Sequence, residues 1–344
     1  MISMKEIAKV CNVSQAVVSK ALADRPGVSP ATRQRILEVA RQFNYRPNAL
    51  VRSLQQGQTM TVAVAASVME DVYAARILQA ILERLYHAGY EVLMFSWDQQ
   101  VRDGSHMLRS MVERRVDGLL MFPPAETPSA EYMAELRSFR RPIVLLDQAW
   151  RGAEFDFVGF DDIGGARQAT EHLLDLGHRD IANLHHRGVS TGQDRFDGYL
   201  AAMMARSATV RQEWVLDSGI DYDASFAQAQ RLLALPHRPT AVVCFNDVAA
   251  LAVMAAAADR GLSVPRDLSI VGFADLPQAQ QVRPSLTTVR QDAGQLGARA
   301  VAHLMDRIQE TRNNSADRLP AAQERLPTEL VVRGSSGPLR SSST

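Results

Sequence analysis

The side chains best suited to catalysis in this sequence do not form a known catalytic pattern. Asp161 and Asp162 could act as an acid/base pair or hold a metal ion, but adjacent carboxylates on a loop diverge. The run His185-His186-Arg187 has the wrong spacing for a helical metal pair, so a plain loop pair is the simpler interpretation. The sequence has no GxxxxGK phosphate loop, HExxH zinc motif or GxSxG nucleophile elbow, and the glycines of 152–165 lack GxGxxG spacing. We therefore expect a protein that is not an enzyme and has no cofactor and no metal site.

A second group of polar side chains lies on a short helix expected over residues 15–22. The apolar spacing of residues 5–10 predicts a first helix, residues 11–13 are a tight turn, and Ser14 is a natural N-cap for the second helix. On that second helix Ala16, Val17, Ala21 and Leu22 can face inward, which leaves Gln15, Ser19 and Lys20 outside. Two short helices on such a turn form a helix-turn-helix unit, whose second helix fits the major groove of DNA. An ordinary helical hairpin is the alternative.

A third helix and a short, marginally helical segment complete this region. Pro30 can open a helix at no cost in hydrogen bonds, and the apolar residues between 36 and 43 give that helix a buried face. The helix must stop before Pro47. Residues 49–54 could then form one or two helical turns before Gly57, which is too short to be stable alone. We expect this segment to become ordered only when it meets a partner.

Charge indicates that the partner is DNA. Residues 1–58 contain nine Lys or Arg against three Asp or Glu, a net charge of +6. The whole chain sums to zero, so residues 59–344 carry −6. A positive module on a mildly acidic body is typical of a protein that binds phosphates with strong salt dependence.

The segments MKEIAKVCNVSQAVVSKAL and VSPATRQRILEVARQFNYRPNALVRSL resemble the lactose-repressor (LacI) family of bacterial transcription regulators. The resemblance extends over roughly residues 3–335 and implies a repressor with the following DNA-binding residues: Ser14, Gln15, Ala16, Ser19, Lys20, Asn48 and Leu54. Within that set, Gln15, Ala16 and Lys20 would read base edges, and Leu54 would wedge into the minor groove. Lys20 departs from the arginine most common there, so the preferred half-site is expected to differ from the commonest one.

From residue 61 the pattern changes to short apolar runs alternating with longer helical segments. The runs predict strands over 62–66, 91–95, 118–122, 143–147, 157–160, 181–184, 241–245 and 269–273. The segments between them predict helices, such as 75–87, 105–114, 165–176, 228–235 and 248–260. This alternation favours two parallel sheets covered on both faces, and hence two Rossmann-like subdomains with a ligand cleft at the carboxyl ends of the strands.

The fold class we expect is therefore an all-α helix-turn-helix headpiece plus an α/β core of two Rossmann-like subdomains, which the resemblance identifies as periplasmic-binding-protein-like. The chain would cross between subdomains near residues 160, 291 and 319. The expected domains are the headpiece 1–47, a hinge helix and linker 48–59, a core 60–334 and a disordered tail 335–344. Within the core, 60–160 and 292–318 would form the N-subdomain, and 161–291 and 319–334 the C-subdomain.

The resemblance also implies which residues bind a small-molecule effector in the cleft: Tyr73, Phe122, Asp161, Thr191, Arg195, Asn246 and Gln291. Phe122 and Phe160 could each stack on a ligand or simply close the core. One departure is informative, because the family usually places an aspartate where this chain has Ala274. Arg195 would then lack its usual counter-carboxylate, and the basic run at 185–187 would add positive charge at the same end. On that reasoning the effector is a sugar acid or a phosphorylated sugar.

Compartment and assembly follow from simpler features. The two cysteines are far apart and suggest no disulfide, and the first residues do not resemble a signal peptide. We expect a cytoplasmic protein without a membrane segment that binds a palindromic double-stranded operator as a homodimer, because the tail lacks the leucine heptads of tetrameric relatives. An exported solute-binding protein would share the core but would carry a signal and no headpiece. A sugar kinase fused to a helix-turn-helix would need a phosphate-binding glycine loop.

Overall fold

The structure is a computed structural model that describes residues 2–22, 24–45, 58–66, 72–96, 105–124, 128–150, 152, 154–219, 221–313 and 320–339. Its contacts divide the chain into two compact units, Met1–Met60 and Thr61–Thr344. Asn48, Leu54 and most of the predicted hinge lie outside the described residues. No helix in the described ranges combines the length and apolarity needed to cross a bilayer.

The smaller unit contains the three predicted helices, α1 (Met4–Val10), α2 (Gln15–Leu22) and α3 (Pro30–Gln42). Their starts are fixed by side-chain caps. Ser3 and Glu6 form a reciprocal capping box at α1, and the Ser14 hydroxyl accepts a hydrogen bond from the Val17 amide (3.3 Å) at α2. Ser29 caps α3 immediately before Pro30.

A small apolar core holds these helices together. It consists of Ile7, Ala8, Cys11, Val18, Ala21, Ile36 and Ala40. The predicted inward face of α2 was partly wrong: Val18 is fully buried, whereas Ala16 is exposed. Val18 and Ala21 lie three positions apart and so share one side of the helix, whereas Ala16 lies on the opposite side.

The larger unit contains two six-stranded sheets. The first, in the order β11-β5-β4-β3-β1-β2, is entirely parallel, and the second, β12-β10-β9-β8-β6-β7, is parallel except for β12. The strands of the first sheet are β1 (Thr61–Ala66), β2 (Glu91–Ser96), β3 (Gly118–Met121), β4 (Ile143–Leu146), β5 (Asp156–Phe160) and β11 (Gln323–Leu326). Those of the second are β6 (Ile181–His185), β7 (Val215–Asp217), β8 (Ala241–Cys244), β9 (Ser269–Ala274), β10 (Thr287–Arg290) and β12 (Glu329–Val331).

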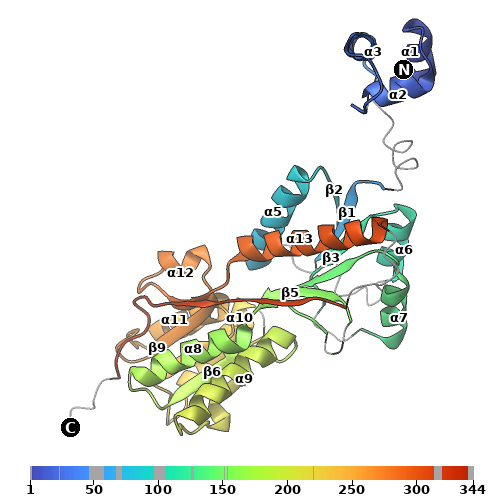
Figure 1. The fold of residues 1–344 in the computed structure, drawn as a ribbon. Coiled ribbons are helices and arrows are strands. Elements are labelled where there is room, and N and C mark those ends of the chain that lie inside the picture. Colours follow the sequence, from blue (N-terminus) through green and yellow to red (C-terminus); the bar gives the residue numbers. More distant parts are fainter. Residues whose placement is uncertain are drawn as a thin grey trace. The chain divides into compact units, whose positions relative to one another are not determined.

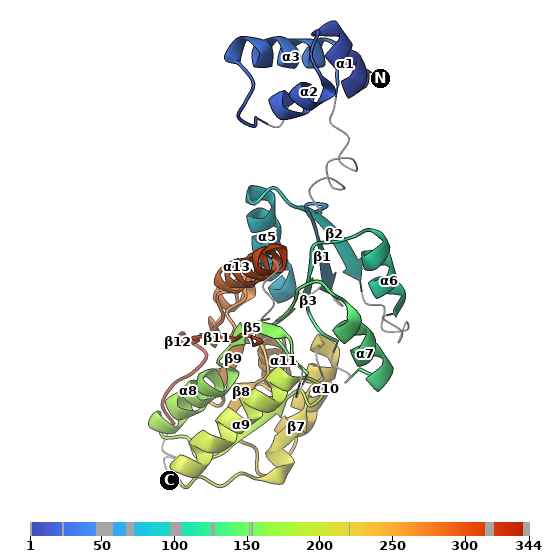
Figure 2. The ribbon, with the colours of Figure 1, turned by 45° about the vertical axis from the view of Figure 1, so that its right-hand side comes forward.

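Helices cover both faces of each sheet, as parallel sheets require. The N-subdomain sheet has α5 (Val72–His87) and α13 (Ala293–Arg312) together on one face (Figure 1, Figure 2), and α6 (Ser105–Glu113) and α7 (Ala130–Ser138) on the other. The C-subdomain sheet lies between the pair α8 (Asp162–Asp175) and α9 (Ser190–Ala205) and the pair α10 (Tyr222–Leu233) and α11 (Asp247–Asp259). A short helix, α12 (Pro277–Gln281), follows β9.

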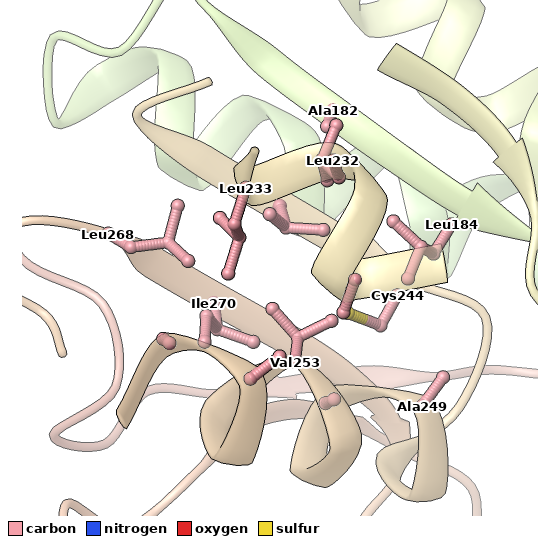
Figure 3. Close-up of a cluster of buried hydrophobic side chains, with 14 of the residues drawn as sticks. Ala182, Leu184, Leu232, Leu233, Cys244, Ala249, Val253, Leu268 and Ile270 are labelled. Atoms are coloured by element: carbon pink, nitrogen blue, oxygen red, sulfur yellow. The ribbon is translucent and has the colours of Figure 1, made fainter. Parts of the chain in front are cut away.

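The C-subdomain core explains why its strands are continuous apolar runs. Under α10 and α11, Leu232, Leu233 and Val253 pack on Ala182, Leu184 and Ile270 of the sheet and on Leu268 just before β9 (Figure 3). The other face of the same strands packs under α8 and α9 through a separate cluster that includes Ile181, Val243 and Val271. Alternate residues of one strand therefore serve two cores, so both faces must be apolar.

Two predicted boundaries are wrong. The segment from 319 was assigned to the C-subdomain, yet β11 pairs with β5 in the N-subdomain sheet, and only β12 pairs with β10. The third crossing therefore lies at residues 327 and 328. The tail was predicted to be disordered, yet its residues 335–339 are ordered. Ser335 is fully buried and donates a hydrogen bond to the Ile270 carbonyl (2.6 Å), and the Leu339 amide donates to the Leu176 carbonyl.

Candidate functional site

The carboxyl ends of strands from both sheets meet at one cleft, where ligands bind in open α/β sheets. A cavity of about 120 Å³ lies there. It is lined by Ala66, Tyr73, Ala74, Phe122, Asp147, Gln148, Val189, Thr191, Arg195, Phe245, Asn246, Val248, Ala274, Leu276 and Gln291. Six of the seven predicted effector residues are in this set, although they come from widely separated segments of the chain. A larger groove of about 670 Å³ lies between α6 and α7 and contains none of them.

Arg195, on the first turns of α9, is held in the cavity wall by three hydrogen bonds from its guanidinium. Its Nε donates to Asp162 Oδ1 (2.7 Å), Nη1 donates to the Phe245 carbonyl (2.7 Å), and Nη2 donates to Gln291 Oε1 (3.4 Å). Its guanidinium also lies 3.9 Å from the ring centroid of Phe273 and 4.7 Å from that of Phe245. These contacts fix the orientation of the guanidinium before any ligand arrives.

Asp162 is the carboxylate behind Arg195. It is 1% exposed and lies at the start of α8, where the chain has just crossed into the C-subdomain. Burial raises the pKa of Asp162 to about 7, and the neighbouring Arg195 opposes that rise by favouring the charged form. Among the described residues, Asp162 Oδ2 has no hydrogen-bond partner. The pair is therefore a buried ion pair with one acceptor to spare.

Tyr73 and Asp147 form a second polar pair across the cavity. The Tyr73 hydroxyl donates to Asp147 Oδ1 (2.7 Å), and burial together with the Asp147 charge raises the pKa of Tyr73 well above its ordinary value. Asp147 follows β4 with φ of 66°, a left-handed conformation that aspartate tolerates better than most residues. That conformation turns the chain at the end of the strand and places the carboxylate in the cavity.

The remaining predicted residues provide hydrogen-bonding groups and an apolar wall. Asn246 caps α11 by accepting from the Ala249 amide (2.8 Å) and also lines the cavity. Gln291 is 2% exposed, and its Nε2 has no hydrogen-bond partner among the described residues. Thr191 and Phe122 line the cavity as predicted, whereas Phe160 is fully buried and belongs to the core.

Asp161 was expected in the cleft, and this expectation is wrong. It is exposed, and its carboxylate accepts a hydrogen bond from the Gly164 amide (2.9 Å) as the N-cap of α8. The helix that Asp161 starts then carries the next residue, Asp162, inward. The adjacent acids therefore have different roles: Asp161 caps the helix and Asp162 binds Arg195.

Two features of the structure remove the support for an anionic effector. Arg195 does have a counter-carboxylate, Asp162, which comes from the first crossing and not from the end of β9. The basic run at 185–187 does not line the cavity. Arg187 Nε donates to His185 Nε2 (3.0 Å), and burial followed by the Arg187 charge lowers the pKa of His185, which disfavours its cationic form.

Comparison with known proteins identifies the family. The model described as "Bacterial regulatory proteins, lacI family" matches residues 3–48, and the model described as "Periplasmic binding protein-like domain" matches residues 170–336. A repressor named HTH-type transcriptional repressor PurR from Actinobacillus pleuropneumoniae is 30% identical over 97% of this chain and 98% of its own length. The chain belongs to the LacI family. It is therefore a DNA-binding transcriptional repressor with a ligand-binding core, and it is a regulator and not an enzyme.

Other members of the LacI family agree with this assignment. A repressor of the same name from Pasteurella multocida is 31% identical over 97% of this chain and 98% of its own length. Among solved structures, a LacI family regulator from Enterococcus faecium with bound ribose has a TM-score of 0.70 at 25% identity and covers 81% of this chain and all of its own. The lac repressor dimer bound to operator and an anti-inducer has a TM-score of 0.85 at 24% identity, covering 98% of this chain and 99% of its own.

The LacI headpiece presents its predicted DNA-binding residues outward. Gln15, Ala16 and Lys20 are exposed on α2, Ser19 is partly exposed, and Ser14 is exposed while its hydroxyl caps the helix. The exposed position of Ala16 is what a base contact through its methyl group requires.

Two carboxylates at the cavity, Asp147 and Asp162, were not predicted as site residues. Asp147 ends an apolar strand and was taken as part of that strand, although a carboxylate at the carboxyl end of a buried parallel strand is itself a signal for the ligand edge. Asp162 was considered only as a diverging neighbour of Asp161. The helical period that begins at residue 162 could have indicated that it turns inward.

Proposed function

We propose that this LacI-family repressor binds a palindromic operator as a homodimer, in the cytoplasm, and that a small carbohydrate-type metabolite bound in the cleft controls its operator affinity. The observation that carries the proposal is the cavity at the strand ends, whose polar side chains come from both subdomains: Tyr73 and Asp147 from one, Arg195 and Asn246 from the other.

The chemistry of this cavity suits a ligand with several hydroxyl or carbonyl groups. Asp147 accepts hydrogen bonds, Arg195 and the unpartnered Nε2 of Gln291 donate them, and Asn246 can do both. Phe122 and Phe245 supply flat apolar surface beside these groups. The LacI family regulator from Enterococcus faecium holds bound ribose, a neutral sugar of this kind. That ligand agrees with a carbohydrate-type effector here.

A sugar acid or sugar phosphate, the effector favoured by the sequence, loses its support. Among the described residues, the lining of the cavity together with Asp162, which is paired with Arg195, holds one guanidinium, that of Arg195, and two carboxylates, those of Asp147 and Asp162. An anion would therefore meet no excess of positive charge, so we propose an uncharged effector.

Coupling between the cleft and the operator is proposed to act through the segment around Leu54, which lies outside the described residues. The cavity of about 120 Å³ is smaller than typical ligand sites, which begin at about 300 Å³, so an effector displaces walls that belong to two subdomains. A coupling free energy of about 1–3 kcal/mol is enough to change operator occupancy if residues 49–54 form a marginal helix.

Selection of genomic fragments by the purified protein, followed by sequencing, tests the DNA-binding part of the proposal. Enrichment of one palindrome is expected, because a twofold dimer presents two copies of α2. No enrichment, with or without metabolite extract, would contradict it. On the enriched site, Leu54→Ala should weaken specific binding far more than non-specific binding, whereas equal losses on both DNAs would refute the wedge role of Leu54.

The effector is tested by calorimetric titration against a panel of neutral sugars and their acids. An uncharged sugar should bind with an affinity that falls on Arg195→Gln or Gln291→Leu, since both lose donors to the ligand. The proposed effector class fails if the wild-type protein binds only charged members of the panel.

A further inference from the structure

The ion pair between Arg195 and Asp162 has a geometry that bears on which ligands the cavity accepts. Arg195 lines the cavity, whereas Asp162 does not line it and is 1% exposed. Asp162 binds the Nε edge of the guanidinium, at 2.7 Å, while Nη2 donates to Gln291, which also lines the cavity. The carboxylate therefore neutralises the guanidinium from behind and leaves Nη2 and Gln291 as hydrogen-bond donors without net positive charge.

Among the described residues that line the cavity, none besides Arg195 is a cation. Ala274, at the end of β9, lines the cavity with a methyl group, and Asp147 lines it with a carboxylate held by Tyr73. The charged and titratable groups that act on Asp162 are Arg195 and Asp194 from α9 and Asp147 from the end of β4. Asp194 is itself paired with Arg325 (3.2 Å), so among these described groups two carboxylates, Asp162 and Asp147, remain against the single guanidinium of Arg195, and the field at the cavity is not positive when Asp162 is ionised.

We propose that Asp162 sets the charge selectivity of the effector cavity: by neutralising Arg195 from behind, it makes the cavity accept an uncharged polyhydroxylated ligand and reject the anionic analogue. This inference rests on the proposed function of the cleft. It assigns to Asp162 a positioning role as well, because its carboxylate fixes Nε and thereby directs Nη2 toward Gln291.

Asp162→Asn is the direct test, since it keeps an oxygen for Arg195 Nε and removes one negative charge. The probe is inorganic sulfate, whose charge does not change over the range used, titrated at constant ionic strength and at about pH 8, above the pKa of Asp162. Binding is read from thermal shift and calorimetry on the full chain. Asp162→Asn should bind sulfate at least about tenfold more tightly than the wild type, because the guanidinium that meets the anion then lacks its paired carboxylate.

Asp161→Asn is the matched control, since it removes the same charge at the adjacent exposed position and asparagine caps a helix as well as aspartate does. It should bind sulfate as weakly as the wild type. In a third variant, Asp162→Asn with Ala274→Asp, a carboxylate returns at the end of β9, and sulfate binding should disappear again. Sulfate binding equal in the wild type, Asp161→Asn and Asp162→Asn would overturn the proposal.

If Asp162→Asn does not fold, a pH titration of the wild type tests the same role of Asp162. Lowering the pH from about 8 to about 6 protonates Asp162 itself, so sulfate binding should appear in the wild type and be suppressed in Ala274→Asp. Sulfate binding that stays absent at low pH, or that Ala274→Asp leaves unchanged, would refute the role of Asp162. Fragment selection by the wild type is independent of all these titrations, so a failed operator search and a failed charge selectivity are distinguishable.

Discussion

Gly198→Ala tests the closest packing contact behind the effector cavity. Gly198 lies on α9 where that helix crosses α8, and a Cβ at this position would lie 2.2 Å from the Ile163 carbonyl oxygen and 3.0 Å from the Arg167 amide nitrogen. Both neighbours are backbone atoms of one helix and cannot rotate away. Ordinary contact begins at 3.4 Å, so the helices must separate by about 1 Å, the difference between 3.4 and 2.2 Å.

The cost of that separation can be bounded. Overpacking a tight contact costs about 1–3 kcal/mol, and rigid backbone on both sides favours the upper end. Alanine in a helix recovers about 1 kcal/mol relative to glycine. The net destabilisation is therefore about 2 kcal/mol, which lowers the Tm of the core transition by about 4–8 °C for a unit of this size. Because Arg195 lies one turn earlier on α9, effector affinity should fall as well.

Scanning calorimetry of the full chain measures this effect, with Gly294→Ala as control. Gly294 also lies on a helix, α13, but it is exposed and its nearest neighbour is the Asp292 carboxylate at 3.2 Å. That substitution should leave the Tm unchanged or raise it slightly. A Tm for Gly198→Ala equal to or above the wild type would refute the packing argument, since propensity alone predicts a gain.

The ion pairs and the headpiece support three further predictions. Folding raises the pKa of Asp162, so ionisation of this carboxyl destabilises the folded state as the pH rises from about 4 to about 7. The Tm of Asp162→Asn should therefore fall less over this pH range than the Tm of the wild type. Asp156→Ala should destabilise the core by about 3–5 kcal/mol in urea titrations, because it removes the two 2.8 Å hydrogen bonds from the Arg307 guanidinium to the Asp156 carboxylate. Asp175→Ala, which breaks the exposed pair with Arg206, should cost about 1 kcal/mol at most. Lys20→Ala should reduce the slope of log affinity against log salt by about 1 if Lys20 meets a phosphate, and should relax base preference instead if it reads a guanine.

Local rules were sufficient for most of the elements. Capping by Ser14, the proline opening of α3 and the apolar runs that became eight of the strands each depend on a few adjacent residues, so the sequence alone could locate them. The strands β7, β10, β11 and β12 were missed because short strands with polar residues, such as Gln323–Leu326, resemble loops until a neighbour pairs with them. The sequence also did not predict that Ser335 in the tail is ordered, because Ser335 is held by hydrogen bonds to Ile270 and Thr287, which are distant in sequence.

What the sequence determined by itself was the family, the three-helix headpiece and the doubly wound core, which depend on composition, periodicity and motif, all properties of nearby residues. The family resemblance added six of the fifteen residues that line the cavity. What only the tertiary structure decided was the electrostatic balance of the cavity. Asp162 and Arg195 are 33 positions apart, and an ion pair between them depends on how α8 and α9 pack together. The charge of a site is the sum over residues that are neighbours in space. The sequence pattern therefore showed that a carboxylate is missing at Ala274, but it could not show that Asp162 supplies one to Arg195.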